Sequence, residues 1–512
     1  MFFTITMILA LVTAIPAALL TARYNLHMFQ LMGYKNWKKQ ALLIPNGILG
    51  IVALICPHGV TMILLILWNL VLCKYYAYLR KSNTKKKLVY TMRVRRQVAT
   101  DVIVNGIILA LVWIFCGVNY VPGTAAVLIS LQMTALLLVN LVNRPAEKMI
   151  TNHFINDAKR MLKEVPGLTI IGITGSYGKT SVKYYLQTLL QDHFNVLITP
   201  ESYNTPMGVV KTIRGSLKST HEIFVCEMGA RHVGDIKEIC DIVHPHHGVI
   251  TSIGPQHLET FFNMDNIVHT KYELADALPA DGMLFLNGDN EYVTGNSDAY
   301  ANKIFYRSQT TGEGYQVSDI QLSQLGTEFT VTAPDGTSER FQMRLVGEHN
   351  VINVVGAIAV ANSMGISLRD LRVPVRRIQP VAHRLQMIER GAVTIIDDAY
   401  NSNPVGSKAA VETLAMFDGV RILITPGMVE LGKEEEQYNY KFGTYAAACC
   451  DYILLVGRKH TEPIKKGVLD SGFSEEKCHV YDTLEDALSF AYSIKDEGHK
   501  FILLENDLPD NY

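Results

Sequence analysis

The chain has 512 residues, a length typical of three or four domains, and a formal net charge of −1. This balance hides a split, since residues 1–150 hold fifteen Lys and Arg against two acidic residues and carry +13, which leaves −14 for the remainder. Such a basic region predicts binding to nucleic acid or to a membrane, and its apolar context favours the membrane over a nucleic-acid partner. The eight cysteines show no CxxC and no regular spacing, so neither a disulfide framework nor a zinc site is expected.

Five apolar runs dominate the first part of the chain. Each is close to the ~20 residues that a helix needs to cross a bilayer, and none contains an acidic residue apart from Asp101 at one edge. The turn-forming stretches CPHG (56–59) and YVPG (120–123) separate the second run from the third and the fourth from the fifth. The runs lie at about 2–22, 41–59, 60–79, 102–120 and 123–143.

The positive charge between these runs predicts their orientation. Segments 23–40 and 80–97 carry twelve of the fifteen Lys and Arg, and cytoplasmic loops are the ones enriched in these residues. We therefore predict that residues 1–145 form a multi-pass transmembrane domain of about five helices in the plasma membrane, with the N-terminus outside and the remaining domains cytoplasmic. Two alternatives are a cleaved signal peptide, although the first run lacks a basic start, and a buried helical hairpin over 41–79.

Residues 146–164 are predicted to form an amphipathic connector helix. Met149, Ile150, Phe154, Ala158 and Met161 recur at helical spacing. Such a helix would either lie at the membrane surface or pack against a neighbouring domain.

A nucleotide site is predicted where the apolar run LTIIGITG (168–175) leads into SYGKTS (176–181). A strand, a glycine turn and a helix N-terminus place backbone N–H groups and the helix dipole against an anion. Lys179 would neutralise the β- and γ-phosphates, and the Thr180 hydroxyl would reach Mg²⁺. The pattern is T-G-S-x-G-K-T, which departs from the strict phosphate-loop motif because residue 173 is Ile.

Two later strands end in residues that suit the same site. The run EIFVCEMG (222–229) delivers Glu227 at its carboxyl end, where open α/β sheets bind ligands, and this makes Glu227 a candidate Mg²⁺ ligand. The run HGVITSIGPQH (247–257) delivers His257 in the same manner. Lys271 lies in a predicted helix over 267–278, where a solvated lysine is the ordinary interpretation.

From about residue 168 onward the chain resembles the Mur ligases, and within them the type that adds D-alanyl-D-alanine. The motifs that carry this resemblance occur in order and span about two-thirds of the protein. They are TGSYGKTS (174–181), SYNTPMG (202–208), CEMGARHVGDI (226–236), GPQHLETF (254–261), KYELADAL (271–278), GEHNVINVVGAIAVA (347–361), HRLQ (383–386) and DDAYNSNPVGSKAAVETL (397–414).

The resemblance implies an ATP-dependent ligase that joins a carboxylate to an amine through an acyl phosphate, with release of ADP and phosphate. It implies that Thr180 and Glu227 hold one Mg²⁺, and that His257 and a carbamylated Lys271 serve a second. A carbamate would supply the anionic oxygens that hard cations prefer. The implied catalytic residues are Lys179, Glu227, His257, Lys271 and Arg384.

The same resemblance implies contacts to the nucleotide and the substrates. Asn350 and Asn353 would meet the adenine, Asp398 the ribose, and Arg384 the γ-phosphate. Asn350 and Asp398 have alternative roles as helix caps. The implied phosphate loop comprises Thr174, Gly175, Ser176, Tyr177, Gly178, Lys179, Thr180 and Ser181. The implied substrate contacts are Asn204, Thr205, Tyr400 and Asn401.

The expected fold is a membrane α-helical domain joined to an α/β ligase. Residues 165–380 would form the central, phosphate-loop ATPase domain, and residues 381–512 a small doubly wound C-terminal domain. Strand–helix signals recur in the latter at VTIIDD, RILITPG, YILLVG and KFILLEN. Closure of the two domains around ATP would exclude water from the acyl phosphate.

The chain departs from the family pattern in two places. The family's first domain, which binds the UDP part of a soluble substrate, is replaced by the apolar region, and PGMVELG (426–432) has Gly427 where an Asp is usual. We therefore expect a membrane-embedded ligase that couples an amino acid or small peptide to a lipid-linked cell-envelope glycan or its precursor. Envelope-biosynthesis enzymes or a second copy of the chain are the protein partners that fit this expectation.

Other functions stay open. Within the enzyme class, the alternatives are a membrane-anchored polyglutamate-type synthase and a D-alanyl-D-alanine-adding ligase of peptidoglycan precursors. An ATP-driven transporter or sensor is an alternative of another class, and the near absence of charge within the apolar runs argues against it. An inactive scaffold is disfavoured because all the implied catalytic residues are present.

Overall fold

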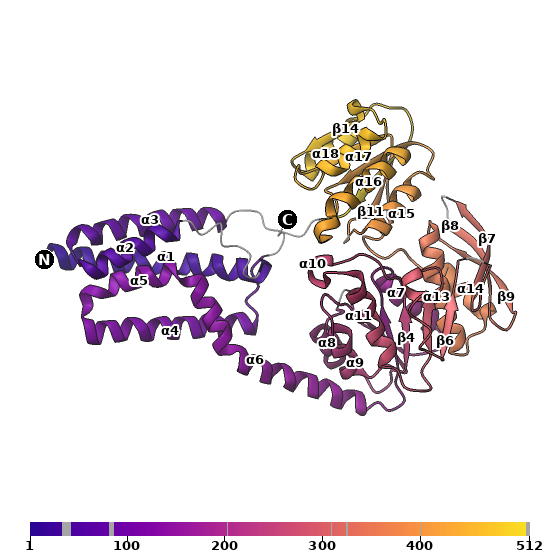
Figure 1. Ribbon diagram of the computed structural model, residues 1–512, viewed down its shortest axis with the longest axis horizontal. Helices are drawn as coiled ribbons and strands as arrows, with labels where there is room; N and C mark the ends of the chain where they lie inside the picture. Colours follow the sequence, from indigo (N-terminus) through magenta and orange to yellow (C-terminus); the bar gives the residue numbers. More distant parts are fainter. Residues whose placement is uncertain are drawn as a thin grey trace. The chain divides into compact units, whose positions relative to one another are not determined.

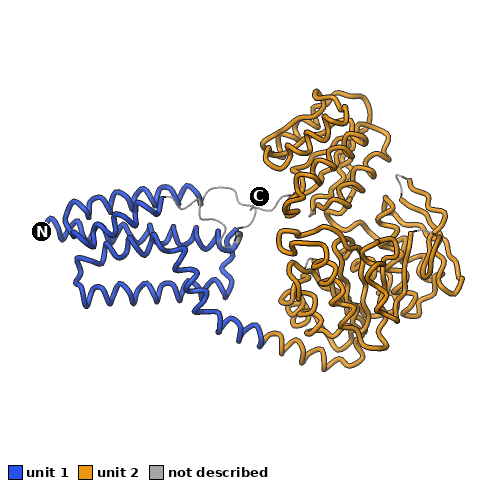
Figure 2. The backbone as a smooth tube through the Cα atoms, in the orientation of Figure 1, with its two compact units in different colours: residues 1–153, 509–512 blue, residues 154–508 orange. Residues whose placement is uncertain are grey.

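The computed structural model describes residues 1–32, 42–80, 87–201, 203–308, 310–323, 326–400 and 402–507. These residues fall into two compact units, the first ending at His153 and the second covering Phe154–Leu508 (Figure 2). Helix α6, Gln132–Lys163, begins in the first unit and ends in the second.

The first unit is entirely helical in its described residues (Figure 1). Its longest helix, α1, buries small residues such as Ala10 and Ala17 and exposes large apolar ones such as Ile15 and Leu19. Small residues let helices approach closely, and an apolar exterior is typical of helices that face lipid. The elements before α6 are α1 Phe2–Met32, α2 Leu43–Ile55, α3 Gly59–Arg80, α4 Met92–Cys116, the 3-10 turn η2 Val118–Tyr120 and α5 Val121–Ser130.

The helices differ from the five predicted runs. Among the described residues, α1, α3 and α4 are long and apolar enough to cross a membrane, and a fourth span results if the bent pair of η2–α5 and α6 is taken as one. The second run forms only the 13-residue helix α2, about 20 Å long at 1.5 Å per residue, which is short of a ~30 Å hydrocarbon core. The fifth run is divided at Leu131, where the axis bends by 76°.

The short helices α2 and α5 pack closely, backbone against backbone. A Cβ atom on Gly50 of α2 would lie 2.9 Å from the carbonyl oxygen of Gly123 in α5, and the converse contact is also 2.9 Å. Asn46 of α2 donates to the carbonyl oxygen of Ala126 at 2.8 Å. The second predicted span is thus the short helix α2, packed against α5, and the fifth is divided between α5 and the start of α6. The number of crossings and their orientation stay predictions, and the basic residues of 33–41 and 81–86 lie outside the described part.

Helix α6 corrects the separate connector predicted over 146–164. It continues without interruption through Pro145 from the apolar region to Lys163. Ala158 is fully buried, and Phe154, Met161 and Leu162 pack against the same core of the second unit. The Arg214 guanidinium bonds Asp157 at 2.7 Å and lies 4.3 Å from the centre of the Phe154 ring. The last turns of α6 therefore serve as a packing helix, which was one of the two predicted alternatives.

A parallel six-stranded sheet forms the centre of the second unit, in the order β2-β3-β1-β4-β5-β6. Helices α7, α13 and α14 contribute to the core on one face, and α8, α9 and the end of α6 to the core on the other. The strands are β1 Thr169–Thr174, β2 Val196–Ile198, β3 Ile223–Glu227, β4 His247–Ile250, β5 Leu284–Asn287 and β6 Lys303–Tyr306. The helices are α7 Lys179–Leu190, α8 Pro206–Ser216, α9 Asp235–Val243, α10 Leu258–Phe261, α11 Met264–Asp276, α12 Glu291–Thr294, α13 Glu348–Ser363 and α14 Leu368–Arg377.

An antiparallel three-stranded sheet was not predicted from the sequence. It consists of β7 Gln316–Ser323, β8 Gly326–Thr332 and β9 Ser338–Met343, and packs against α14 (Figure 1). Its buried Phe329 and Phe341 stack with ring centroids 5.9 Å apart, so the small sheet extends the main core.

The C-terminal segment forms a second six-stranded sheet, in the order β10-β11-β15-β12-β13-β14. Only β10 is antiparallel to its neighbour. The predicted doubly wound arrangement is confirmed, since α15 and α16 pack on one face and α18 on the other. The elements are β10 Gln386–Arg390, β11 Val393–Asp398, α15 Pro404–Leu414, β12 Val420–Thr425, η3 Gly432–Glu434, α16 Glu435–Cys449, β13 Tyr452–Val456, α17 Glu462–Asp470, η4 Glu475–Lys477, β14 Cys478–Tyr481, α18 Leu484–Ser493 and β15 Lys500–Glu505. Both large sheets belong to one compact unit, so the predicted boundary at 380/381 stays a prediction.

The packing of α6 can be tested with a charge placed on its buried face. Ala158→Glu puts a carboxylate into an apolar core without a partner, which costs several kcal/mol. We expect the melting temperature of the detergent-solubilised protein to fall by about 5 °C or more. Asn156→Glu, on the exposed face of the same helix, is the matched control. Equal stability of the two variants would show that this helix does not pack on the core.

Candidate active site

The loop between β1 and α7 is shaped by two glycines that no other residue could replace without strain. Gly175 and Gly178 have φ values of 148° and 82°, a region that side chains disfavour. A Cβ atom on Gly175 would lie 2.0 Å from Thr251 Oγ1, and one on Gly178 would lie 2.5 Å from Asn353 Oδ1. The Ser176 amide donates to the carbonyl oxygen of Ser252 at 2.6 Å. The loop is thereby held against the end of β4.

Lys179 begins α7 and turns back over this loop. Its ammonium donates to the carbonyl oxygens of Gly175 at 2.6 Å and Ser176 at 3.2 Å. Burial lowers the pKa of Lys179 to about 8, with Glu227 opposing the shift and Arg384 adding to it. A buried cation beside a glycine loop and a helix N-terminus suits a polyphosphate, whose charge would favour the protonated form.

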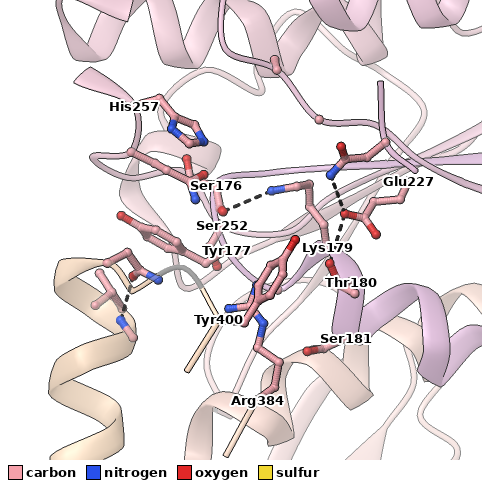
Figure 3. Close-up of a pocket in the computed structure, with 18 of the residues that line it drawn as sticks. Ser176, Tyr177, Lys179, Thr180, Ser181, Glu227, Ser252, His257, Arg384 and Tyr400 are labelled. Atoms are coloured by element: carbon pink, nitrogen blue, oxygen red, sulfur yellow. Dashed lines mark hydrogen bonds between the residues drawn. The ribbon is translucent and has the colours of Figure 1, made fainter. Parts of the chain in front are cut away.

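Glu227 ends β3 and accepts three hydrogen bonds. One carboxylate oxygen accepts from Thr180 Oγ1 at 3.1 Å and from Asn204 Nδ2 at 3.0 Å, and the other from Lys183 Nζ at 2.9 Å. Burial by itself would raise the pKa of Glu227, but Lys183 and Lys179 outweigh it and the net pKa is lowered. Figure 3 shows the Thr180 and Glu227 side chains pointing toward one another.

Lys183 is a site residue that the sequence interpretation missed. Its side chain is fully buried and pairs with Glu227, which is 1% exposed. Lys179 and Lys183 are four residues apart and so share one face of α7. This spacing could have identified Lys183 from the sequence, because a second lysine on the ligand-facing side of a phosphate-loop helix needs an anionic partner.

The oxygen atoms of Thr180 and Glu227 are the hard ligands that Mg²⁺ prefers, and they lie beside the loop that would hold phosphates. Within the described residues no group of three or more His, Cys, Asp or Glu could enclose a metal ion by itself. Thr180 and Glu227 could therefore hold Mg²⁺ only together with other ligands. Phosphate oxygens and water are the ligands that usually complete the coordination of this ion.

The residues implied for a second metal lie in different surroundings. His257 Nδ1 forms an ion-pair contact with Glu430 of the C-terminal segment, and Arg231 lies 3.5 Å from the same carboxylate. Glu430 has a φ of 65°, outside the usual range for its residue type, and was not predicted as a site residue. Lys271 is 2% exposed, and burial followed by the charge of Lys179 holds its pKa well below the ordinary value.

The C-terminal segment contributes Arg384, Asp398 and Tyr400. The Arg384 guanidinium lies 4.8 Å from the centre of the Tyr400 ring, and Figure 3 shows the two side chains together. One carboxylate oxygen of Asp398 accepts from the amide of Leu385 at 3.2 Å. Burial raises the pKa of Asp398 to about 6, and Arg384 opposes the rise.

The helix-cap alternatives for two predicted residues are wrong. Asn403, not Asp398, caps α15, since its Oδ1 accepts from the amide of Gly406 at 2.8 Å. Helix α13 has no side-chain cap. Asn350 instead accepts from the Tyr185 hydroxyl at 2.9 Å and donates to the carbonyl oxygen of Val346 at 2.8 Å.

One cavity of about 640 Å³ brings most of the predicted residues together. Thr174, Gly175 and Lys271 are not part of its lining, and Asn401 lies outside the described residues. The predicted residues in the lining are Ser176, Tyr177, Gly178, Lys179, Thr180, Ser181, Asn204, Thr205, Glu227, His257, Asn350, Asn353, Arg384, Asp398 and Tyr400. Residues far apart in the chain, from both large sheets, thus face a single space.

Comparison with known families agrees with this arrangement. Residues 173–361 match the Mur ligase middle domain, and residues 383–504 match the Mur ligase, glutamate ligase domain. The chain belongs to the Mur ligase family. Mur ligases are ADP-forming, ATP-dependent ligases that use Mg²⁺, so the enzyme class predicted from the motifs is confirmed at the level of the family.

Several named relatives share the same description, UDP-N-acetylmuramoyl-tripeptide–D-alanyl-D-alanine ligase. The one from Escherichia coli K12 is 29% identical over 62% of this chain and 73% of its own length. The one from Mycobacterium leprae is 34% identical over 62% of this chain and 67% of its own. The match covers 62% of the length of the Bacillus subtilis relative and 49% of the length of the relatives from two other mycobacterial species. The chain therefore spans about half to three-quarters of the length of these relatives.

Solved structures give the same fold. A MurF crystal structure from Acinetobacter baumannii superposes with a TM-score of 0.64 at 26% identity, over 70% of this chain and 77% of that one. A MurF ligase from Thermotoga maritima, solved in complex with ADP, superposes with a TM-score of 0.63 at 23% identity, over 70% and 80% of the two chains. The predicted Mur-type α/β architecture is therefore confirmed.

The buried Lys183–Glu227 pair gives a test of this ligase site. Lys183→Met leaves a buried carboxylate without its nearest cation, and breaking a pair of this kind costs about 3–5 kcal/mol. We expect a clear loss of stability in denaturant unfolding. The double variant Lys183→Met/Glu227→Gln should recover part of it, because no unpaired charge is left.

The exposed pair Lys237–Asp241, at 2.6 Å, supplies the control. Lys237→Met should leave the stability essentially unchanged, since water solvates both partners. Equal unfolding midpoints for Lys183→Met and Lys237→Met would contradict the structural importance of the buried pair.

Proposed function

We propose that the chain is an ATP-dependent ligase that joins D-alanyl-D-alanine to a carboxylate of a peptidoglycan precursor. The observation that carries the proposal is one cavity lined both by the Lys179–Thr180–Glu227 cluster and by Arg384 and Asp398 of the C-terminal segment. The names of the relatives support the choice of amine and acceptor. This was an alternative in the sequence interpretation, and the comparisons favour it over the lipid-linked main hypothesis.

The reaction would proceed in two steps. The acceptor carboxylate attacks the γ-phosphate of ATP to form an acyl phosphate and ADP, and the amine then attacks the acyl carbon while phosphate leaves. Lys179 and Arg384 would hold the phosphate oxygens and offset their charge during transfer. Thr180 and Glu227 would hold Mg²⁺, which neutralises phosphate charge when bound.

Further roles follow from the resemblance and from the local contacts. Asn353, beside Gly178, would meet the nucleotide together with Asn350, although both polar atoms of the Asn350 side chain have internal partners. His257 and a carbamylated Lys271 would serve a second metal ion, and the burial of Lys271 suits conversion of its amine to an anionic group that a cation can hold.

The proposed substrate contacts fall into two groups. Tyr400 is exposed at the cavity beside Arg384 and is free to meet a substrate. Asn204 donates to Glu227, and Thr205 Oγ1 accepts from the amide of Gly208 at the start of α8. These last two contacts favour a role in shaping the site around Glu227.

We also propose that the apolar helices hold the enzyme in the plasma membrane, with the ligase domains in the cytoplasm where ATP is present. The three long apolar helices and the basic segments between the runs support this placement. An enzyme held in the membrane would have the acceptor carboxylate of a lipid-linked precursor within reach of its active site. The match to the Mur ligase middle domain begins at residue 173, and the apolar helices occupy the chain before it. This position of the apolar helices supports a lipid-linked acceptor as the second candidate.

The ligase proposal is tested by product release. With ATP, Mg²⁺, UDP-N-acetylmuramoyl-tripeptide and D-alanyl-D-alanine, the purified protein should release ADP and phosphate in step with amide formation. Lys179→Ala should lower kcat/KM by about 100- to 1,000-fold, because a cation at the transferred phosphate is lost. Lys218→Ala, on an exposed loop, is the control. ATP hydrolysis that is indifferent to the dipeptide would contradict ligation and favour a transporter or sensor.

The acceptor is tested in a second assay with the protein in lipid vesicles. A lipid-linked muramoyl-tripeptide and its UDP-linked counterpart are offered at equal concentrations, with D-alanyl-D-alanine as the amine. A ligase of soluble precursors should use the UDP-linked acceptor at least as fast. Preference for the lipid-linked acceptor by about tenfold or more, equivalent to about 1.4 kcal/mol in the transition state, would establish the second candidate. Polymeric products that carry no lipid would favour a polyglutamate-type synthase.

A further inference from the structure

A buried carboxyl group, Glu505, lies at the end of β15 and has no role in the chemistry described above. Strand β15 is central in the second sheet, between β11 and β12. The carboxyl ends of these three parallel strands present Asp398, Glu505 and Thr425 at one edge. Open α/β sheets bind their ligands at this edge.

Glu505 is held by two hydroxyl groups. Ser402 Oγ donates to one carboxylate oxygen, and Thr425 Oγ1 donates to the other at 2.9 Å. The side chain is 0% exposed, and among the described residues no lysine, arginine or histidine is paired with it. Burial, with Asp398 nearby, raises the pKa of Glu505 to about 8. A buried acid in these surroundings favours a cationic ligand, which would stabilise its ionised form.

Ser402 connects this acid to the cavity. It is half-buried and lines the 640 Å³ space, next to Asp398 and the start of α15. A hydroxyl group has one hydrogen to donate, and Ser402 donates it to Glu505, so it can only accept from a ligand. The backbone is fixed as well, since the Ser402 amide donates to Asn506 Oδ1 at 3.2 Å and Asn506 Nδ2 to the carbonyl oxygen of Gly427 at 2.6 Å.

Gly427 lies near Glu505 and has no side chain that could carry a negative charge. It has a φ of 85°, and a Cβ atom there would lie 3.0 Å from the carbonyl oxygen of His460 and 3.1 Å from Asn439 Oδ1. The Gly427 amide donates to Thr425 Oγ1 at 3.1 Å, the hydroxyl that bonds Glu505. The acidic group near this turn is therefore Glu505 of the neighbouring strand β15.

We propose that Ser402 and Glu505 form the binding site for the ammonium group of the incoming amine. Ser402 accepts an N–H from the amine at the cavity wall, and Glu505 behind it supplies the opposite charge and orients the hydroxyl. Glu505 is thus a positioning residue and Ser402 the contact residue. This inference rests on the proposed function and assigns the amine side of the same cavity.

The test compares Glu505→Gln and Ser402→Ala with the wild type in the ligase assay. We expect Glu505→Gln to raise KM for D-alanyl-D-alanine by about 10- to 100-fold, the usual range for a hydrogen bond to a charged group, and to leave KM for ATP within about twofold. Ser402→Ala should raise the same KM by about tenfold. Glu412→Gln, on the exposed side of α15, is the matched control.

A stability measurement separates this role from a structural one. Glu505→Gln replaces a buried acid by a neutral group of the same shape, so the melting temperature should stay the same or rise. A lower melting temperature with an unchanged KM for the dipeptide would overturn the proposal. An increase in the KM for ATP in place of the KM for the dipeptide would also overturn it, and would assign Ser402 and Glu505 to the ribose. If Glu505→Gln does not fold, Ser402→Ala decides by the same criteria.

Direct binding distinguishes failure of this inference from failure of the proposed function. Calorimetric titration with D-alanyl-D-alanine should show tighter binding to the wild type than to Glu505→Gln. N-acetyl-D-alanyl-D-alanine, which lacks the ammonium group, should bind both proteins equally weakly. Binding of the dipeptide without product release would refute the ligase proposal alone. Turnover by the wild type with equal dipeptide affinity in both proteins would refute the inference alone, and no dipeptide binding at all would refute both.

Discussion

A carboxylate buried at the end of a central strand organises the catalytic half of the molecule. In the pairing of β1 with β3, Glu227 lies opposite Ile173, one residue before the phosphate loop begins. The charge is tolerated there because Lys183 pairs with it and Thr180 and Asn204 donate to it. These partners come from α7 and from the loop before α8. A single buried ion therefore fixes three segments around the place where nucleotide phosphates would lie, and the apolar core beneath them keeps water from screening the charges.

The sequence was informative where the signal is local. A β-branched run into glycine and then Lys179 predicts a strand, a turn and a helix. Strand β1, Thr169–Thr174, lies within the predicted run, and α7 begins at Lys179 as predicted. Glu430 and Glu505 could not be found in this way, because their roles depend on partners that are 173 and 103 residues away in the chain. The small sheet β7–β9 was missed for the same reason, since its strands become stable only by packing on α14 and each other.

Hydropathy alone does not show how the apolar runs are divided into helices. It measures how long a stretch avoids charge, and so it cannot distinguish one span from a 13-residue helix that turns back at CPHG. The break at Leu131 carries no glycine or proline at the break itself, and it becomes visible only through the axes of α5 and α6. Asn46 and Gly50 were the local signs, because a buried amide and a close-packed glycine both require a neighbouring backbone, which α5 supplies.

The charges around the cavity fall into two groups of opposite sign, and each group is unfavourable by itself. Burial is the main cause that lowers the pKa of Lys179 and of Lys271, and the neighbouring cations Arg384 and Lys179, respectively, add to it. Burial raises the pKa of Glu505, and the nearby Asp398 adds to the rise. Proteins place like charges together where a ligand supplies the opposite charge. A polyphosphate would relieve the cationic group and an ammonium the anionic one. Lys179 and Lys271 belong to helices that pack on the first large sheet, whereas Arg384, Asp398 and Glu505 belong to the C-terminal segment. Both parts of the chain therefore contribute charge around one cavity, and the electrostatics favour binding both reactants of an amide-forming reaction side by side.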